Sequence, residues 1–203
     1  MGAELSTARW LAPASFVIDF AAQTYGMLSS PNMKDIHDAN ISFFSPQPYF
    51  IAGFFFPQQM FQLAWLWRLH KAEASEKGVS SMVDFAPFYA LGNVRLPTFA
   101  GIGVLDLLHN FSAAYFVNAE PSTAVKVATG VGFGLFSAAS DWIFGGCLVY
   151  DLAALAVGQS MYGNAGWSRL LGIYAGVAAA IVGMRNFFSP PYNMASRGEY
   201  QSL

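Results

Sequence analysis

Two ionisable side chains lie three residues apart in a long apolar stretch. Asp106 and His109 fall within residues 96–117, LPTFAGIGVLDLLHNFSAAYFV, which as a helix is long enough to cross a bilayer core of about 30 Å. A spacing of three places both on one helical face, where they could act as a proton relay or as half of a metal site. The alternative is a hydrogen-bonded pair that orients the helix in a bundle. We expect this anchoring role rather than catalysis.

Four more polar residues interrupt apolar stretches and are candidates for the same intramembrane site: Asp19, Asp141, Gln58 and Gln62. Carboxyl groups that converge on one cavity could bind a cation, couple protons to transport, or perform acid–base chemistry on a lipid-like substrate. Gln58 and Gln62 are four residues apart on one face, just after Pro57, which predicts a helix kink. We assign no catalytic residue among these candidates.

We predict no metal site and no cofactor. The other two histidines, His37 and His70, fall in a polar loop and at the end of an apolar stretch, away from Asp106 and His109. Cys147 is the only cysteine, which excludes a disulfide within the chain and a thiol pair for zinc. The sequence contains no nucleophile elbow and no glycine-rich phosphate loop between a strand and a helix.

The composition that must position these residues is typical of a membrane protein. Of the 203 residues, 55% are hydrophobic and only 11% are charged, against about 25% charged in soluble domains. The fold class predicted is all-α, a single polytopic transmembrane helix bundle over residues 1–203. Five spans are expected, near residues 10–28, 49–69, 96–117, 126–150 and 168–188.

Three other segments are expected to lie outside these spans. The apolar segment 82–94 is too short to cross as a helix, and is either a re-entrant or interfacial segment or a truncated span. Residues 29–47 are rich in polar residues and are expected to form an exposed loop. Residues 189–203 form a polar tail after Pro190 and Pro191.

Small residues at steps of four predict close helix packing in the last two spans, at Gly130 and Gly134 and at Gly172 and Gly176. The expected partners are therefore the lipid bilayer and either another membrane protein or a second copy of the chain. A net charge of -2 without a basic run indicates no nucleic-acid partner.

The distribution of Lys and Arg predicts orientation. Whether segment 82–94 crosses or not, more of these residues fall on the side of the N-terminus, so we expect the N-terminus in the cytoplasm. Only the side of the C-terminus changes between the two counts. The expected location is the endomembrane system or the plasma membrane, as a multi-pass protein.

Two resemblances bear on the class. Pro57-Gln58, followed by Leu63, Trp65, Arg68 and Lys71, is similar in outline to the proline–glutamine motif of the PQ-loop transporters, which implies a kinked helix beside a solute path. Longer segments, SFFSPQPYFIAGFFFPQQ and TFAGIGVLDLLHN through DWIFGGCLVYDLAALAVGQ, resemble a group of small fungal multi-pass membrane proteins of unassigned function. In that group a full span follows the equivalent of FYALGN, so the step to Arg95-Leu96-Pro97 resembles a deletion.

Three hypotheses on function follow. The first is a protein whose polar bundle interior serves solute or ion binding, transport or the assembly of a membrane complex. The second is a membrane-embedded enzyme that acts on a lipid or isoprenoid through intramembrane Asp and His groups. The third is a structural membrane partner in which the acids hold helices together.

Overall fold

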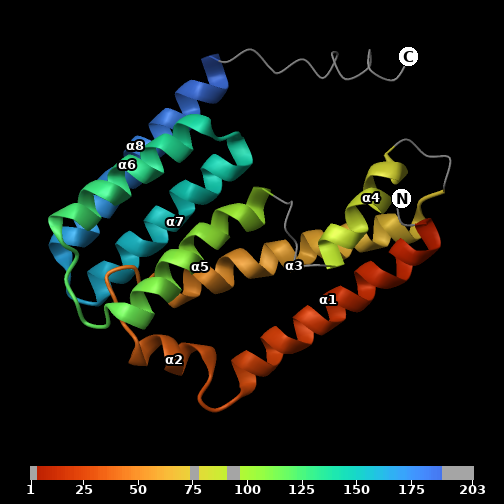
Figure 1. Ribbon diagram of the computed structural model, residues 1–203, viewed down its shortest axis with the longest axis horizontal. Helices are drawn as coiled ribbons and strands as arrows, with labels where there is room; N and C mark the ends of the chain where they lie inside the picture. The colour runs from red at the N-terminus through yellow and green to blue at the C-terminus, as the bar shows by residue number, and fades with distance from the viewer. Residues whose placement is uncertain (1–3, 74–77, 91–96, 189–203) are drawn as a thin grey trace.

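The computed structural model describes residues 4–73, 78–90 and 97–188, and within them the chain is all-helical, with eight helices and no strand. Figure 1 shows their arrangement. They are α1 (Leu5–Leu28), α2 (Met33–Ala39), α3 (Pro48–Lys71), α4 (Val79–Ala90), α5 (Pro97–Tyr115), α6 (Thr123–Ala139), α7 (Trp142–Met161) and α8 (Ala165–Phe188). The predicted helical class is confirmed; a bundle with five spans is not.

The helices form two groups that share α3 (Figure 1). In the larger group α7 packs against α5 and α8, and α6 packs against α8, around a core that includes Leu148, Leu152, Leu155 and Leu171. In the smaller group α1 and α4 pack together against the second half of α3, around Ala8, Ala12, Leu69, Val83 and Ala86. Because α3 is 24 residues long, about 36 Å, its two halves can serve two cores.

A break at Ser140 and Asp141 divides the segment that we predicted as one span, residues 126–150. Ser140 is extended, with φ −86° and ψ 154°, so α6 ends before it and α7 begins after Asp141. The freed carbonyl of Ser140 accepts a hydrogen bond from Arg185 Nε of α8 at 2.9 Å, and Arg185 Nη1 also donates to the carbonyl of Ala138. A cation on a neighbouring helix thus caps the end of α6.

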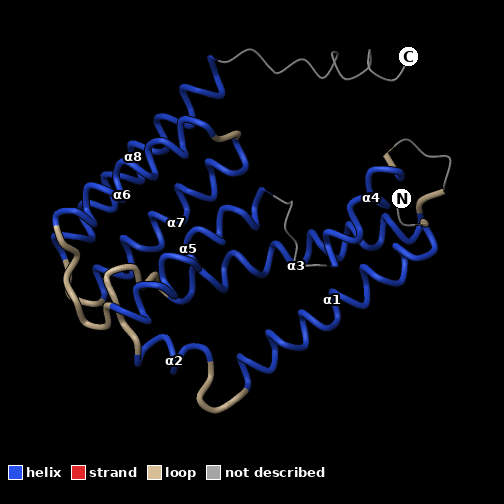
Figure 2. The backbone as a smooth tube through the Cα atoms, viewed as in Figure 1, coloured by secondary structure: helices blue, strands red, loops and turns tan. Residues whose placement is uncertain are grey.

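The segment predicted as an exposed loop, residues 29–47, is only partly exposed. It contains α2, which begins with a capping box between Asn32 and Asp35. After α2, residues 42–46 are buried. We call residues 41–47 the inserted loop; Figure 2 shows the loop that joins α2 to α3. Burial of a polar loop requires partners for its main chain, which three helices supply, as described below.

Close helix packing occurs at one of the four predicted glycines. A Cβ at Gly130 would lie 2.7 Å from the ring of Tyr174 on α8, so α6 and α8 need a glycine here. Around Gly134, Gly172 and Gly176 there is open space, so these three do not mediate contacts between the described helices.

Two helices, α7 and α8, are long and apolar enough to cross a membrane. In the most apolar window of α7 half of the residues are buried, but in that of α8 only 17% are. An apolar helix with so little burial favours membrane insertion over a place in the core of a soluble domain.

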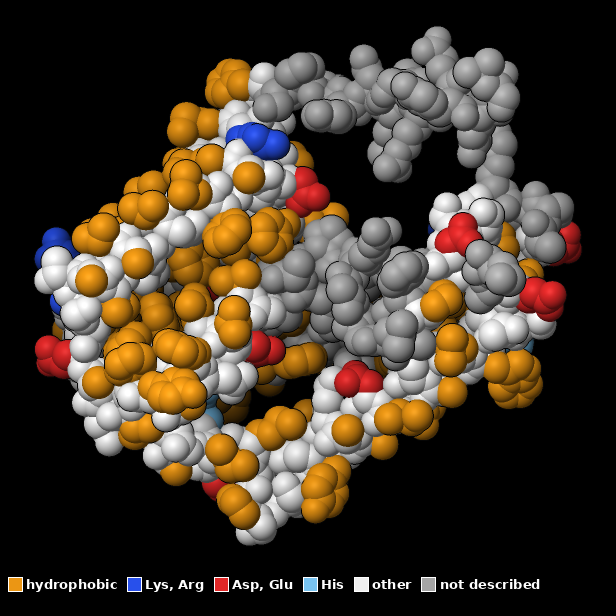
Figure 3. All heavy atoms as spheres, viewed as in Figure 1, with side chains coloured by type: hydrophobic (Ala, Val, Ile, Leu, Met, Phe, Trp, Pro, Cys, Tyr) orange, Lys and Arg blue, Asp and Glu red, His pale blue; other side chains and the backbone are white. Residues whose placement is uncertain are grey.

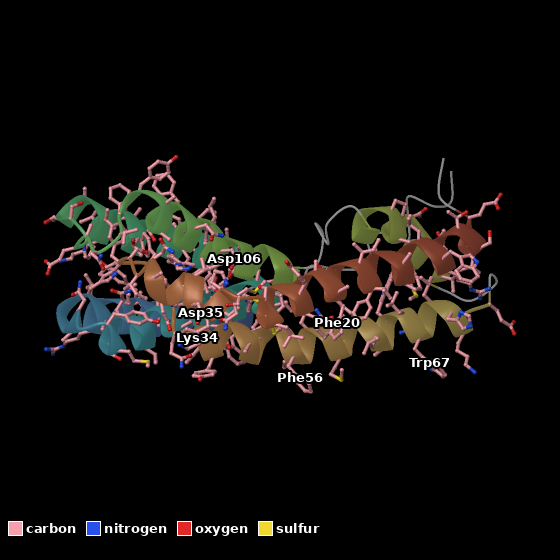
Figure 4. All side chains as sticks on the ribbon, turned by 90° about the horizontal axis from the view of Figure 1, so that it is seen from below. Phe20, Lys34, Asp35, Phe56, Trp67 and Asp106 are labelled. Carbon is pink, nitrogen blue, oxygen red and sulfur yellow. The ribbon has the colours of Figure 1, made fainter. Side chains whose placement is uncertain are left out.

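Apolar side chains are also exposed well beyond α8. Figure 3 shows them spread over one face of the molecule, and Figure 4 shows Phe56 and Trp67 directed outward from α3. Large hydrophobic residues with more than half of their surface exposed occur on α1, α3, α6 and α8, among them Val17, Ile18, Phe56, Phe61, Val131, Leu135, Ile173 and Val177.

The predicted short segment 82–94 corresponds in part to α4, whose 12 residues measure about 18 Å and pack on α1. The step at Arg95-Leu96 and the tail 189–203 lie outside the described residues.

Candidate functional site

Asp106 lies on α5, on the side of the larger group that faces α1 and α3 (Figure 4), and its side chain is exposed. It does not form the expected hydrogen-bonded pair with His109. The ring of His109 is instead hydrogen-bonded to another histidine, His37, and the buried Nδ1 of His109 has no hydrogen-bond partner among the described residues. The two predicted residues therefore belong to two adjoining parts of the polar interior.

The remaining candidates do not join Asp106. Asp141 is exposed and is the N-cap of α7, where its Oδ1 accepts a hydrogen bond from the amide of Phe144 at 2.8 Å. Asp19 lies on α1 and accepts a hydrogen bond from Gln23 one turn later, at 2.8 Å. Both carboxylates thus have local structural roles, as a helix cap and as an i,i+4 partner.

The two predicted glutamines are buried on α3. Gln58 and Gln62 are 8% and 2% exposed, and Gln59 beside them is buried as well. The side-chain amides of Gln58 and Gln59 have no hydrogen-bond partner among the described residues. The polar side chains that follow Pro57 are therefore buried in the protein.

Among the described residues the most buried acid is Asp151, which is not one of the candidates predicted from the sequence. It is fully buried in the middle of α7, and neither of its carboxyl oxygens has a hydrogen-bond partner among the described residues. Asp106 on the neighbouring α5 is close enough to interact with it electrostatically. A buried carboxyl without a hydrogen bond costs several kcal/mol in its ionised form, so it must hold a proton or a bound cation.

Two imidazoles and a phenol form a continuous hydrogen-bonded chain between α2, α5 and α7. His37 Nδ1 lies 3.3 Å from His109 Nε2, and His37 Nε2 lies 2.9 Å from the Tyr162 hydroxyl. The Tyr162 hydroxyl also lies 3.4 Å from the carbonyl oxygen of Pro46 in the inserted loop. The two imidazole rings are 4.9 Å apart between centroids. We call His37 and His109 the imidazole pair.

Burial determines the acid–base properties at the outer end of this chain. Burial lowers the pKa of His37 below its ordinary value of 6.5, and Lys34 lowers it further, while Asp38 opposes both. Burial likewise raises the pKa of Tyr162 above 10.0. At neutral pH both groups are therefore uncharged, and each can donate and accept a hydrogen bond.

The inserted loop is fixed beside the imidazole pair by side chains from α5, α7 and α8. Ser42 is hydrogen-bonded to Ser112 at 2.6 Å, and Gln159 Nε2 donates to the carbonyls of Ser42 and Ser45. The indole of Trp167 donates to the carbonyl of Phe43 at 2.6 Å.

The main chains of the inserted loop and α7 are also in direct contact. The amide of Gln47 donates to the carbonyl of Ala154 at 3.0 Å. A Cβ at Gly158 would lie 2.5 to 2.7 Å from main-chain atoms of residues 45–47, which makes this close approach specific to glycine.

Sequence reasoning missed Asp151, His37 and Tyr162. A signal for Asp151 was present: residues 142–161 form an apolar stretch of helical length centred near it, once the boundary is set at Asp141 rather than at residue 150. No local pattern identifies His37 and Tyr162, because their partners are far away in the chain. His37 is 72 residues from His109 and 125 residues from Tyr162.

The described residues contain no group of three or more His, Cys, Asp or Glu side chains that could hold a metal ion. Comparison of the chain with models of protein families, with curated proteins and with solved structures finds no match. The chemistry of the site itself is therefore the basis for a functional assignment.

Proposed function

We propose that this chain is a multi-pass integral membrane protein whose helix bundle binds a proton or a small monovalent cation at Asp151 and Asp106 and moves it along the bundle interior. Asp151 is the observation that carries the proposal. A fully buried carboxyl without a hydrogen-bond partner among the described residues, in an apolar helix of spanning length, is costly to keep and has no packing role that Leu or Ala would not fill better.

The apolar surface of the helices supports the location. Besides α7 and α8, the helices α1 and α3 each contain 24 residues, or about 36 Å, which is sufficient for a bilayer core. Exposed Val, Ile, Leu and Phe side chains on these helices would contact lipid, and the resemblance to small fungal multi-pass proteins agrees with this topology. The cytoplasmic N-terminus stays a prediction from the Lys and Arg count.

The pair of carboxyls supports ion binding in particular. Asp106 is exposed whereas Asp151 is buried, so an ion or proton can reach the first and be transferred to the second. Two neighbouring carboxylates repel each other, and a shared proton or cation removes that repulsion.

The same difference between the two carboxyls favours a second function, an intramembrane enzyme. Acid–base catalysis uses two titratable groups in unlike surroundings, one of which holds a proton while the other is ionised. Asp151 would be the acid and Asp106 the base toward a lipid or isoprenoid that enters beside α5. In this case Asp106→Asn would abolish turnover of such a substrate, and no ion flux would be seen.

The test is ion flux into sealed vesicles that contain the purified full chain and an internal pH-sensitive dye. A potassium diffusion potential drives protons inward, and replacing the external buffer cation with sodium tests for a metal ion. We expect flux with the unaltered chain, at least about tenfold less with Asp151→Asn, and an unchanged flux with Asp84→Asn, an exposed acid on α4. Equal flux for Asp151→Asn and the unaltered chain would refute the proposal.

A further inference from the structure

The imidazole pair lies where the inserted loop closes one end of the larger helix group. From the geometry of the hydrogen-bonded chain described above, we propose that His37 and His109 relay protons between Tyr162, at this end, and the Asp106 and Asp151 site. The relay rests on the proposed function, since it supplies that site with protons, and it adds three residues to it.

An imidazole can accept a proton on one ring nitrogen and release another from the second nitrogen, which is the property a relay needs. Both ring nitrogens of His37 are engaged, one with His109 at 3.3 Å and one with Tyr162 at 2.9 Å. His109 uses Nε2 for His37, and its buried Nδ1 has no hydrogen-bond partner in the part of the chain that the structure describes. That nitrogen is the inner end of the chain.

Each hydrogen bond of the chain can run in either direction. In one direction His109 Nε2–H donates to His37, His37 Nε2–H donates to Tyr162, and the Tyr162 hydroxyl donates to the carbonyl of Pro46. In the other direction Tyr162 donates to His37 and His37 donates to His109. The proton of His109 is then on Nδ1.

The transfer is balanced in protons and involves no electrons. A proton that binds to His109 Nδ1 releases the proton on Nε2 to His37 Nδ1. His37 releases its Nε2 proton to the Tyr162 oxygen, and Tyr162 releases its own proton to water, since its side chain is only half-buried. One proton enters and one leaves. Afterwards every hydrogen bond of the chain has the opposite donor, so the next proton can be transferred in the opposite direction.

The inserted loop explains why a relay is needed at this end of the larger helix group. Phe43, Phe44 and Ser45 are buried, and Gly158 lets the loop approach α7 at main-chain contact distance. Buried side chains thus fill this end of the helix group, and the imidazole pair provides a hydrogen-bonded path through it. On the inner side Asp106 is one turn from His109, about 4.5 Å along the helix axis, which a side chain and one water molecule can cover.

The charged groups around the pair leave it neutral. Lys34 and Asp38 of α2 act on His37 with opposite signs and form an ion pair with each other on the exposed face of the helix. On α5 the nearest acid in sequence is Asp106, and from α7 Tyr162 faces His37 as a neutral phenol. No described carboxylate is hydrogen-bonded to either imidazole, so none fixes the direction of the chain.

The experiment measures how fast Asp151 is protonated after a pH jump, in the full chain in lipid nanodiscs. Infrared absorption of the protonated carboxyl reports on Asp151, and Asp151→Asn identifies its band. We expect His37→Gln and His109→Gln to slow protonation at least about tenfold without moving the titration midpoint, because the amide keeps a hydrogen bond but cannot relay a proton. His70→Gln on α3 is the matched control and should leave the rate unchanged.

Two additions keep the test independent of folding. Tyr162→Phe removes only an oxygen and should slow protonation too, and free imidazole in solution should restore part of the rate in His109→Gln. Unchanged rates in both Gln variants would overturn the relay while the band of Asp151 leaves the proposed function standing. Absence from the unaltered chain of any band that Asp151→Asn removes would show that Asp151 takes up no proton and would overturn the relay, while the flux assay decides on the proposed function separately.

Discussion

At the scale of single residues, the interior of this protein contains polar groups of two kinds. Ser112, Gln159 and Trp167 have hydrogen-bond partners and hold the inserted loop, so their contribution is structural. Among the described residues, Asp151, the Nδ1 of His109 and the side-chain amides of Gln58 and Gln59 are buried without such partners. A packed core tolerates an unpaired polar group only at a cost of about 1–3 kcal/mol, so a function must be sought for these residues, and first for the ionisable ones.

His37 makes the stability of the fold depend on pH. Because burial lowers its pKa below 6.5, the unfolded chain binds a proton more readily than the folded chain. Its contribution to stability is therefore complete above pH 6.5 and is lost as the pH falls below that value, toward the pKa of the folded state. We expect the midpoint of thermal unfolding in detergent to fall over this range.

The change that tests this is His37→Gln, which should flatten the dependence of the unfolding midpoint on pH below 6.5. His70→Gln is the control, because His70 lies on the exposed last turn of α3. An equally steep loss of stability on acidification in His37→Gln and in the unaltered chain would assign the pH dependence to another group.

The sequence indicated part of this site. Asp106 and His109 could be found because an ionisable group in an apolar helix stands out without knowledge of the fold. Their separate roles could not be predicted, since His109 is hydrogen-bonded to His37 on α2, and a contact over 72 residues leaves no local pattern. Asp151 was missed for a different reason. We predicted one span over residues 126–150, which places Asp151 just after the end of a helix, whereas α7 begins after Asp141 and has Asp151 in its middle.

At the scale of elements, the contact between the inserted loop and α7 depends on a glycine. In Gly158→Ala the new methyl would meet main-chain atoms of Ser45, Pro46 and Gln47 at 2.5 to 2.7 Å, and a main chain cannot move aside as a flexible side chain can. We expect a loss of about 1–3 kcal/mol in the free energy of unfolding, together with release of the loop.

Gly146→Ala provides the comparison within α7, because a Cβ there meets nothing within 4 Å. Alanine in an exposed helix interior should raise stability by about 0.5–1 kcal/mol relative to glycine. Chemical denaturation in mild detergent would measure both variants. Similar stabilities for Gly158→Ala and Gly146→Ala would mean that the loop is not packed against α7 in solution.

Helices were easier to predict than their ends and connections. Long apolar runs predict helices because their backbone groups are satisfied within the segment, whatever the surroundings. The break between α6 and α7 depends on Arg185, which caps Ser140 from a helix 45 residues further on. Likewise, residues 41–47 were expected outside, since polar residues with Pro are typical of exposed loops. Their burial depends on Gln159 and Trp167, and thus on the tertiary fold.

At the scale of the whole molecule, the two helix groups differ in how much of their surface is covered. In the larger group the core closes around α7, whereas much of α1, α3, α6 and α8 keeps apolar side chains on the outside (Figure 3). Such an excess of exposed apolar surface is unstable in water unless lipid or another protein covers it. Lipid is the occupant that the proposed function requires.

A spin label on the outer face of α8 would test this requirement. Val177 lies in the middle of α8 and is 51% exposed, and Lys34 lies on the exposed face of α2. In a Cys147→Ala background, which removes the only native thiol, Val177→Cys and Lys34→Cys would each take one label.

In lipid vesicles we expect the label at Val177 to collide more with oxygen than with a hydrated nickel complex, and the label at Lys34 to do the reverse. Oxygen concentrates in hydrocarbon and the nickel complex does not enter it. Equal access of the nickel complex to both positions would place α8 in water and remove the membrane from the proposal, whereas a label at Val177 that neither reagent reaches would show that protein, not lipid, covers this helix.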